Sequence, residues 1–438
     1  MDTRTLPTEL LVEVAEYLKS DKTSLRNLAL VCRQFRYASE GPLYHTINLR
    51  YLHLDFRNDH DILIRVLRTL LERPDLGEKV RTLFLTVYKT ENPNRNYHEN
   101  LILRNDRFQG FTKNCMTVVN RLGFTEKAWW VQKIRTAFEP AFGGILLASV
   151  PNVVRLQLEC GLSQDPDLHY EGDLGTQMAI PISELFGTDQ IPSGIISSFK
   201  KVQQLYLQVP QLTKLAVGMG NIRILTLCMA FEGLVSPYVP YMNFSKLESL
   251  EVRILTEKVE DHEREALGAP EVFTQLLKAM DCPKLKKLSI VFTTTGRGFP
   301  VVDFNFITDG LREPDSPLET LDMCMYPYLE GHPISSLTGL KHIKTLTVEW
   351  NLLFDFDTEF PDLRNKLPQT IEQLDILNAP QDLRHFSKSL LMAKPWLLNL
   401  TQIYIEHHIS STDSEYIRDM NHLIEEQADE AGVQLIIC

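Results

Sequence analysis

An apolar six-residue pattern recurs along the chain and limits the folds that are open to it. The template is apolar-x-x-Leu-x-apolar, and its central residues from 205 onward are 20 to 38 positions apart. Such alternation is typical of a strand with one buried face, and the spacing leaves room for a return segment between strands. A unit this small cannot bury its own apolar face, so we expect the copies to stack. The copies lie at 80–85, 153–158, 202–207, 222–227, 247–252, 285–290, 318–323, 343–348 and 371–376, with variants at 44–49 and 400–405.

These copies resemble leucine-rich repeats over residues 44–438, and segments 272–280 and 414–432 carry helical periodicity between strands. The resemblance implies an α/β fold in which an irregular solenoid has a parallel sheet inside and helices outside. We expect insertions at about 91–140 and 161–200, which either shape a binding site or carry a lid. The pattern leaves one alternative open, in which the same strands belong to another α/β fold.

Two amphipathic helices are predicted before the repeats. Pro7 suits a first helical turn, and Leu10, Leu11, Val14 and Leu18 fall on one face of that helix. In a second helix, capped at Thr23 or Ser24, apolar residues recur from residue 25 to residue 35. Two short helices with so much apolar surface need another surface to cover it.

Residues 6–39, LPTELLVEVAEYLKSDKTSLRNLALVCRQFRYAS, resemble an F-box, with Phe35 where the family more often has Trp. The resemblance implies an F-box over residues 1–43 and a substrate-recognition subunit of an SCF-type E3 ubiquitin ligase. In that family the F-box binds a Skp-type adaptor, and through it a cullin, while the repeats hold a target protein for ubiquitylation and proteasomal degradation. Residues 42–49 and 62–85 are also similar to filamentous-fungal F-box proteins. The expected adaptor-binding residues are Leu6, Pro7, Leu10, Leu11, Val14, Leu18, Leu25, Leu28, Val31 and Phe35.

Two other interpretations stay open. One is a scaffold that binds the adaptor outside ubiquitylation. The other is a non-catalytic repeat protein in which the N-terminal helices only cap the solenoid.

Strand parity predicts the substrate-binding face of the sheet. If the Leu positions of each strand point into the core, the residues between them point to the opposite, concave face. That face is expected to bind the target through Phe84, Arg155, Glu159, Tyr206, Glu251, Arg253, Asp322, Glu349, Tyr404 and Glu406.

Charge and composition exclude several classes of function. A net charge of -12 argues against nucleic acid as a partner, and it favours a basic ligand over an acidic one. No apolar run is long enough for a membrane span and no secretory leader is evident, so we expect no membrane association and a cytoplasmic or nuclear location. Seven scattered cysteines cannot supply the eight ligands of a RING domain, and no metal, cofactor or catalytic residue is predicted. Ubiquitin transfer would belong to partner subunits.

Overall fold

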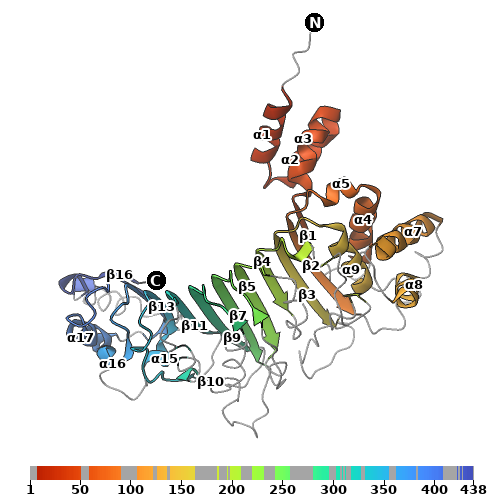
Figure 1. Ribbon diagram of the computed structural model, residues 1–438. Coiled ribbons are helices and arrows are strands. Elements are labelled where there is room, and N and C mark those ends of the chain that lie inside the picture. The colour runs from red at the N-terminus through yellow and green to blue at the C-terminus, as the bar shows by residue number, and fades with distance from the viewer. Residues whose placement is uncertain are drawn as a thin grey trace. The chain divides into compact units, whose positions relative to one another are not determined.

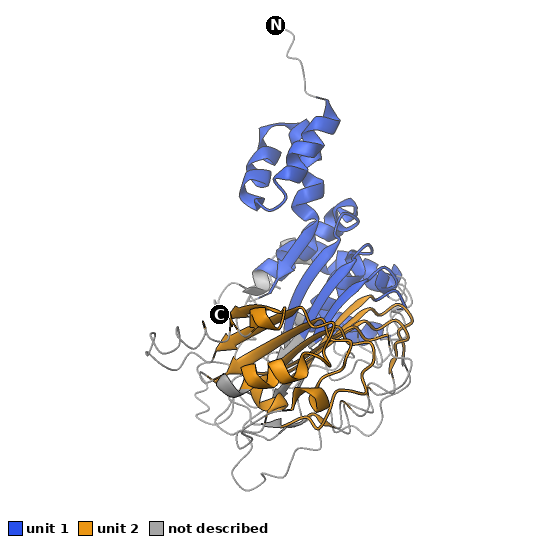
Figure 2. Cartoon of the chain, turned by 90° about the vertical axis from the view of Figure 1, so that its left-hand side faces the viewer, with its two compact units in different colours: residues 1–170, 177–222 blue, residues 171–176, 223–438 orange. Residues whose placement is uncertain are grey.

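The computed structural model describes the chain from residue 7 to residue 437 with internal gaps. It divides the chain into two compact units, of which unit 1 comprises Met1–Tyr170 and Gln177–Ile222 and unit 2 comprises Glu171–Thr176 and Arg223–Cys438 (Figure 2). The residues left undescribed between 7 and 437 are 51–58, 90–105, 122–125, 136–138, 163–184, 187–194, 196–197, 209–219, 231–241, 257–279, 295–301, 306–307, 309–310, 312–316, 327–330, 355–361, 381–382, 408–421, 423–424 and 427.

Unit 1 begins with three short helices, α1 (Thr8–Tyr17), α2 (Lys22–Val31) and α3 (Arg33–Tyr44). Pro7 precedes α1, and its carbonyl accepts the hydrogen bond from the backbone N–H of Leu11 at 3.2 Å. The N-cap of α2 is Asp21, whose Oδ1 accepts from the backbone N–H of Ser24 at 3.0 Å. The predicted caps at Thr23 and Ser24 are therefore wrong, because Ser24 is the donor in this interaction.

The second predicted helix is in fact two helices. Cys32 has an extended backbone, with φ -160°, and separates α2 from α3. Leu28 and Phe35 lie on either side of this break and pack against the same small core. The helical spacing of the apolar residues therefore continues across Cys32, although the helix itself is interrupted there.

The rest of unit 1 alternates strands with helices (Figure 1). Helix α9 packs closely on β2, because a Cβ added at Gly143 would lie 2.7 Å from Val87 Cγ1. Glycine is therefore required there for the approach of the two elements. The elements are β1 (Thr46–Leu49), α4 (Asp59–Glu72), α5 (Pro74–Gly77), β2 (Thr82–Lys89), α7 (Asp106–Arg121), α8 (Lys127–Arg135), α9 (Glu139–Ser149), β3 (Arg155–Leu162) and β4 (Gln204–Gln208).

Unit 2 continues with strands and a few short helices. Its main strands are β5 (Ile224–Ala230), β7 (Ser249–Thr256), β9 (Lys287–Thr294), β11 (Thr320–Tyr326), β13 (Thr345–Glu349), β14 (Gln373–Ala379), β15 (Gln402–His407) and β16 (Gln434–Ile437). Its helices are α15 (Trp350–Leu353), α16 (Leu363–Lys366) and α17 (Arg384–Ala393). Two further parallel pairs are small: β6 (Met242–Asn243) with β8 (Met280–Asp281), and β10 (Val302–Asp303) with β12 (Gly331–His332).

The 12 main strands are parallel and follow chain order within each unit, with β1 to β4 in unit 1 and β5, β7, β9, β11, β13, β14, β15 and β16 in unit 2. The register places Leu83 beside Leu156 and Leu156 beside Leu205, and all three side chains are buried. Each such leucine stabilises the fold by about 1.5–3 kcal/mol relative to an exposed side chain. The aligned leucines explain why the template recurs, since one residue of each strand contributes to the same core layer.

The prediction of strands from the template is confirmed, because each of the 11 copies overlaps one of these strands. Strand β16 was not predicted. The segment 272–280 lies outside the described residues except for Met280, which is in β8 rather than a helix. Much of segment 414–432 also lies outside the described residues, although residues 422, 425–426 and 428–430 are helical. Within the predicted insertion at 91–140 the structure describes α7, α8 and the start of α9.

Candidate partner-binding surfaces

The three N-terminal helices have a small core of their own. Leu11, Ala15, Leu25 and Ala38 are buried in it. Leu18, Leu28, Phe35 and Leu43 pack against it and are partly buried. A three-helix unit needs such a core to hold its helices together, so this half of its apolar surface is used within the chain.

This core corrects the predicted set of adaptor-binding residues. Leu11 is 2% exposed and Leu25 is fully buried, so neither side chain is accessible to a partner without unfolding of the helices. Leu18, Leu28 and Phe35 are half-buried against the core and contribute mainly to its packing. Leu6 lies outside the described residues.

A second apolar stripe on the same helices faces solvent. On α1 it consists of Leu10, Val14 and Tyr17, which are 45%, 47% and 90% exposed and follow helical spacing. On α2, Leu30 and Val31 are 79% and 67% exposed. Pro7 is exposed as well. We call Leu10, Val14, Tyr17, Leu30 and Val31 the exposed apolar patch of α1 and α2.

Sequence reasoning missed two members of this patch, Tyr17 and Leu30. It also missed Tyr37, which is 67% exposed on α3 with its ring 5.9 Å from Lys79 Nζ. One sequence signal was available for Leu30, because it is an apolar residue directly before Val31, which was predicted to bind the adaptor. The three exposed apolar side chains of α1 share one stripe, and side chains grouped in that way mark interaction sites more often than isolated ones do.

Lys22 fastens the start of α2 to the end of α3. Its Nζ donates to the carbonyl of Pro42 at 2.9 Å and to the carbonyl of Leu43 at 3.1 Å. Burial, and to a smaller degree the charge of Lys19, lowers the pKa of this ammonium group. These two bonds supply partners for carbonyls at the last turn of α3, which have none within the helix.

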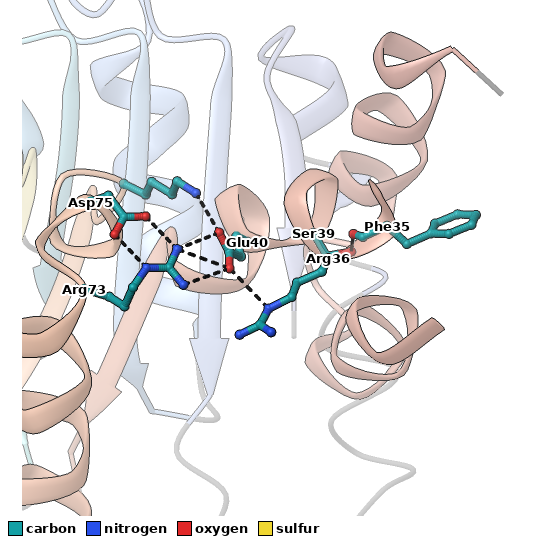
Figure 3. A network of polar contacts seen from close by, with 7 residues as sticks. Phe35, Arg36, Ser39, Glu40, Arg73 and Asp75 are labelled. Atoms are coloured by element: carbon teal, nitrogen blue, oxygen red, sulfur yellow. Dashed lines mark hydrogen bonds and ion pairs between the residues drawn. The ribbon is translucent and has the colours of Figure 1, made fainter. Parts of the chain in front are cut away.

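A charged cluster around Glu40 joins α3 to the segment that leads into β2 (Figure 3). The Glu40 carboxylate lies 3.2 Å from Arg73 Nη2, 3.2 Å from Lys79 Nζ and 3.5 Å from Arg36 Nε. Arg73 also donates to Asp75 Oδ2 at 2.7 Å. Burial alone would raise the pKa of Glu40, but hydrogen bonds from Arg73 and Lys79 outweigh burial and hold the pKa below its ordinary value. We call Glu40, Arg36, Arg73 and Lys79 the Glu40 joint.

Parity separates the two faces of the sheet in unit 1 at most positions, with Thr86 of β2 as a buried exception. Phe84, Glu159 and Tyr206 are half-buried and Arg155 is exposed, whereas the leucines between them are buried. Phe84 lies beside Gln157, and Gln157 beside Tyr206, in the register of β2, β3 and β4. Whether these side chains bind a target stays a prediction.

In unit 2 the same face carries a row in which hydroxyl and carboxylate side chains alternate. The register aligns Thr226, Glu251, Ser289, Asp322, Thr347, Asp375 and Tyr404 across seven strands. Arg253 donates to Glu251 at 2.6 Å, and Lys287 pairs with Asp322 at 2.8 Å. Among the predicted target-binding residues, Arg253 and Glu406 are exposed and Tyr404 is half-buried.

Glu349 is a correction to the predicted open face. It is only 3% exposed, since its carboxylate turns to accept hydrogen bonds from the backbone N–H of Met325 at 3.2 Å and from Asn378 Nδ2 at 2.6 Å. Burial raises the pKa of Glu349 above its ordinary value, and these two bonds only partly oppose that effect. The side chain therefore braces β11 and β14 rather than meeting a ligand.

The described residues offer no assembled metal-binding group. No cluster of three or more His, Cys, Asp or Glu side chains within them has the geometry to hold a metal ion. Burial raises the pKa of the Cys324 and Cys282 thiols to about 12, which keeps both protonated and poorly nucleophilic. In the part of the chain that the structure describes, no helix combines the length and apolarity that a bilayer span demands.

Comparison with known proteins assigns the N-terminal helices to a family. Residues 3–50 match the family model described as F-box-like. This segment contains α1, α2, α3 and β1, so the chain carries an F-box-like domain at the position of the exposed apolar patch. F-box domains in general bind a Skp-type adaptor of SCF ubiquitin ligases, and proteins that contain them are typically non-catalytic. No curated protein matches the chain.

Proposed function

We propose that the chain is a substrate-recognition subunit of an SCF-type E3 ubiquitin ligase. Its F-box-like domain would bind a Skp-type adaptor, and through it a cullin, while the sheet and its connections bind a target protein for ubiquitylation and proteasomal degradation. The chain itself would be non-catalytic, and the partner subunits would transfer ubiquitin.

The observation that carries this proposal is the exposed apolar patch on an F-box-like domain. Five large apolar side chains in water are unfavourable, since full burial of an exposed side chain of this kind gains about 1.5–3 kcal/mol, and roughly half as much for Leu10 and Val14, which are about half-exposed. An adaptor that covers the patch in a standard interface of about 1,600 Å² would remove them from water. A pure solenoid cap has no need of such a patch, because a cap presents a polar outer surface.

The aligned leucine positions support a leucine-rich-repeat solenoid as the substrate module. Each strand contributes its apolar residues to one layer and leaves the alternate residues on the other face, as a stacked repeat requires. The target would contact that second face, at residues such as Phe84, Tyr206, Glu251, Asp322 and Tyr404.

Adaptor binding is tested with Val14→Asp combined with Leu30→Asp in the full-length chain. Both side chains face solvent, so the variant should fold normally. We expect adaptor affinity to fall at least 100-fold, because each carboxylate would be buried without a partner in the complex. Leu28 is unsuitable for this test, since it packs against the core of the helices and its substitution would weaken the fold.

The matched control is Met392→Asp combined with Leu398→Asp, which places the same two charges at exposed apolar residues of unit 2, one on α17 and one shortly after it. It should bind the adaptor as the unmodified chain does. Equal affinity of Val14→Asp/Leu30→Asp and the control would show that the patch is not the docking surface. Capture of the adaptor without any cullin in the same complex would favour the scaffold interpretation over a ligase subunit.

A further inference from the structure

Phe84 occupies an unusual position on the open face of unit 1. It lies in β2 between Asn48 of β1 and Gln157 of β3, on the face opposite the leucines that pack beneath α9. Its register neighbours are polar, so the half-buried ring is an apolar surface within a polar row. An apolar ring among polar side chains is more stable when other groups shield it from water, and two guanidinium groups shield part of the Phe84 ring.

Two arginines flank this ring. The guanidinium carbon of Arg50 lies 4.1 Å from the ring centroid and that of Arg155 lies 5.3 Å from it. Both distances are within the range in which a cation is attracted to an aromatic face. Arg50 is held in place by Asn48 Oδ1 and by Gln157 Oε1, to which it donates at 3.4 Å and 3.2 Å.

Arg155 differs from Arg50 because it is exposed and, among the described residues, makes no ion pair within 4 Å. The acidic residue on the same strand is Glu159, which lies four residues after Arg155. At a rise of about 3.3 Å per residue, the two backbones are about 13 Å apart. The Glu159 carboxylate is engaged elsewhere, by Thr86 Oγ1 at 2.9 Å and Gln157 Nε2 at 2.5 Å.

We infer that Arg155 and Phe84 bind a carboxylate side chain of an acidic peptide segment, with Arg50 fixing the ring between the two guanidinium groups. This inference rests on the proposed function, because it names the chemical class of target segment that the open face of unit 1 would recognise. The planar guanidinium of Arg155 matches a carboxylate through two parallel hydrogen bonds, and the aliphatic stem of a Glu or Asp then lies over the edge of Phe84.

Local charge decides this assignment more than the net charge of the chain. At physiological ionic strength exposed charges are screened beyond about 8 Å, so the distribution of acidic residues elsewhere has little effect at Arg155. A singly charged carboxylate also suits the site better than a phosphate. One guanidinium is open there, and its single positive charge balances one carboxylate through two parallel hydrogen bonds.

The test is a selection from a random 12-residue peptide library on the immobilised full-length chain. We expect the selected peptides to be enriched in Asp and Glu. Fluorescence anisotropy with the best peptide should show a dissociation constant at least tenfold larger for Arg155→Gln. Arg155→Lys should lose less affinity, since it keeps the charge but lacks the planar guanidinium. Arg223→Gln, which removes an exposed arginine of unit 2, is the matched control and should bind normally.

Several results would overturn the inference. They are enrichment of Lys and Arg, equal binding by Arg155→Gln and Arg223→Gln, tighter binding when phosphoserine replaces the key carboxylate, and no selected peptide that depends on Arg155. A change in oligomeric state on Arg155→Gln, measured by light scattering, would instead make a second copy the occupant. Adaptor capture by the unmodified chain is measured separately, so loss of the peptide site and failure of the proposed function are distinguishable.

Discussion

Replacing Glu40 by glutamine tests whether charge holds the N-terminal helices against the start of the sheet in unit 1. Glu40 is 8% exposed and faces three cationic side chains from α3 and from the segment between α4 and β2. Glutamine has the same shape and keeps one acceptor oxygen. The substitution therefore removes the negative charge and little else.

The magnitude follows from how exposed the cations are. The side chains of Lys79, Arg73 and Arg36 are 29%, 42% and 65% exposed, so solvent screens all three pairs to different degrees. Pairs of this kind contribute about 0.2–1 kcal/mol each, with Arg36 at the low end. We expect Glu40→Gln to lower the local stability of the joint by about 1–2 kcal/mol, after allowing for the hydrogen bond that the amide oxygen retains.

Hydrogen exchange measured by mass spectrometry is the suitable assay, because a chain of this size need not unfold in one step. Peptides covering α3 and α5 should exchange about 5- to 30-fold faster in the variant, and the difference should shrink at high salt. The pKa of Glu40 lies below its ordinary value of 4.5, so its contribution is present above that value and lost as the pH falls through the lowered pKa.

The matched control is Glu16→Gln, which removes one exposed pair with Lys19 at 3.6 Å. It should change exchange in α1 by less than twofold. If Glu40→Gln had no more effect on α3 and α5 than this control, the reasoning about the Glu40 joint would be refuted.

Two further predictions concern packing and pH. Gly143→Ala should lower the free energy of unfolding by about 1–3 kcal/mol in chemical denaturation, because its Cβ would meet Val87. The control is Gly110→Ala in α7, where nothing lies within 4 Å of the added Cβ, and it should be neutral or stabilising by up to about 1 kcal/mol. Equal effects of the two substitutions would contradict the close approach of α9 to β2. The raised pKa of Glu349 means that its stabilising contribution is present below the ordinary value and lost as the pH rises through the raised pKa. The melting temperature of the unmodified chain should therefore rise relative to Glu349→Gln between pH 7 and pH 5, and a difference that did not vary with pH would exclude this assignment.

The sequence predicts the strands well because parity is a local property. Leu83 and Leu85 identify β2 without any knowledge of what packs on them, and the same holds for the other copies of the template. Strand β16 was not predicted because Gly432 stands where the template has its first apolar residue, although Leu435 and Ile437 match the template's Leu-x-apolar ending. A short apolar run of this kind is ambiguous by periodicity alone.

The exposed apolar patch of α1 and α2 was predicted less completely, for a physical reason. Leu10 and Leu11 are equally apolar and adjacent on α1, yet one faces solvent and the other is buried. Only the placement of α2 and α3 distinguishes them. The Glu40 joint was missed for a related reason, because Arg73 and Lys79 are 33 and 39 residues away in sequence.

The parallel ladder of aligned leucines has a consequence for how such a chain can change in evolution. Adding a single residue inside a strand would exchange its two faces, so its leucines would no longer align with those of the neighbouring strands. Lengthening a connection between strands leaves the alignment of the leucines unchanged and costs only about 0.6 kcal/mol for each doubling of the connection's length. The connections are thus free to vary in length and composition while the strands stay fixed, so new recognition segments can be gained at the borders of an unchanged sheet.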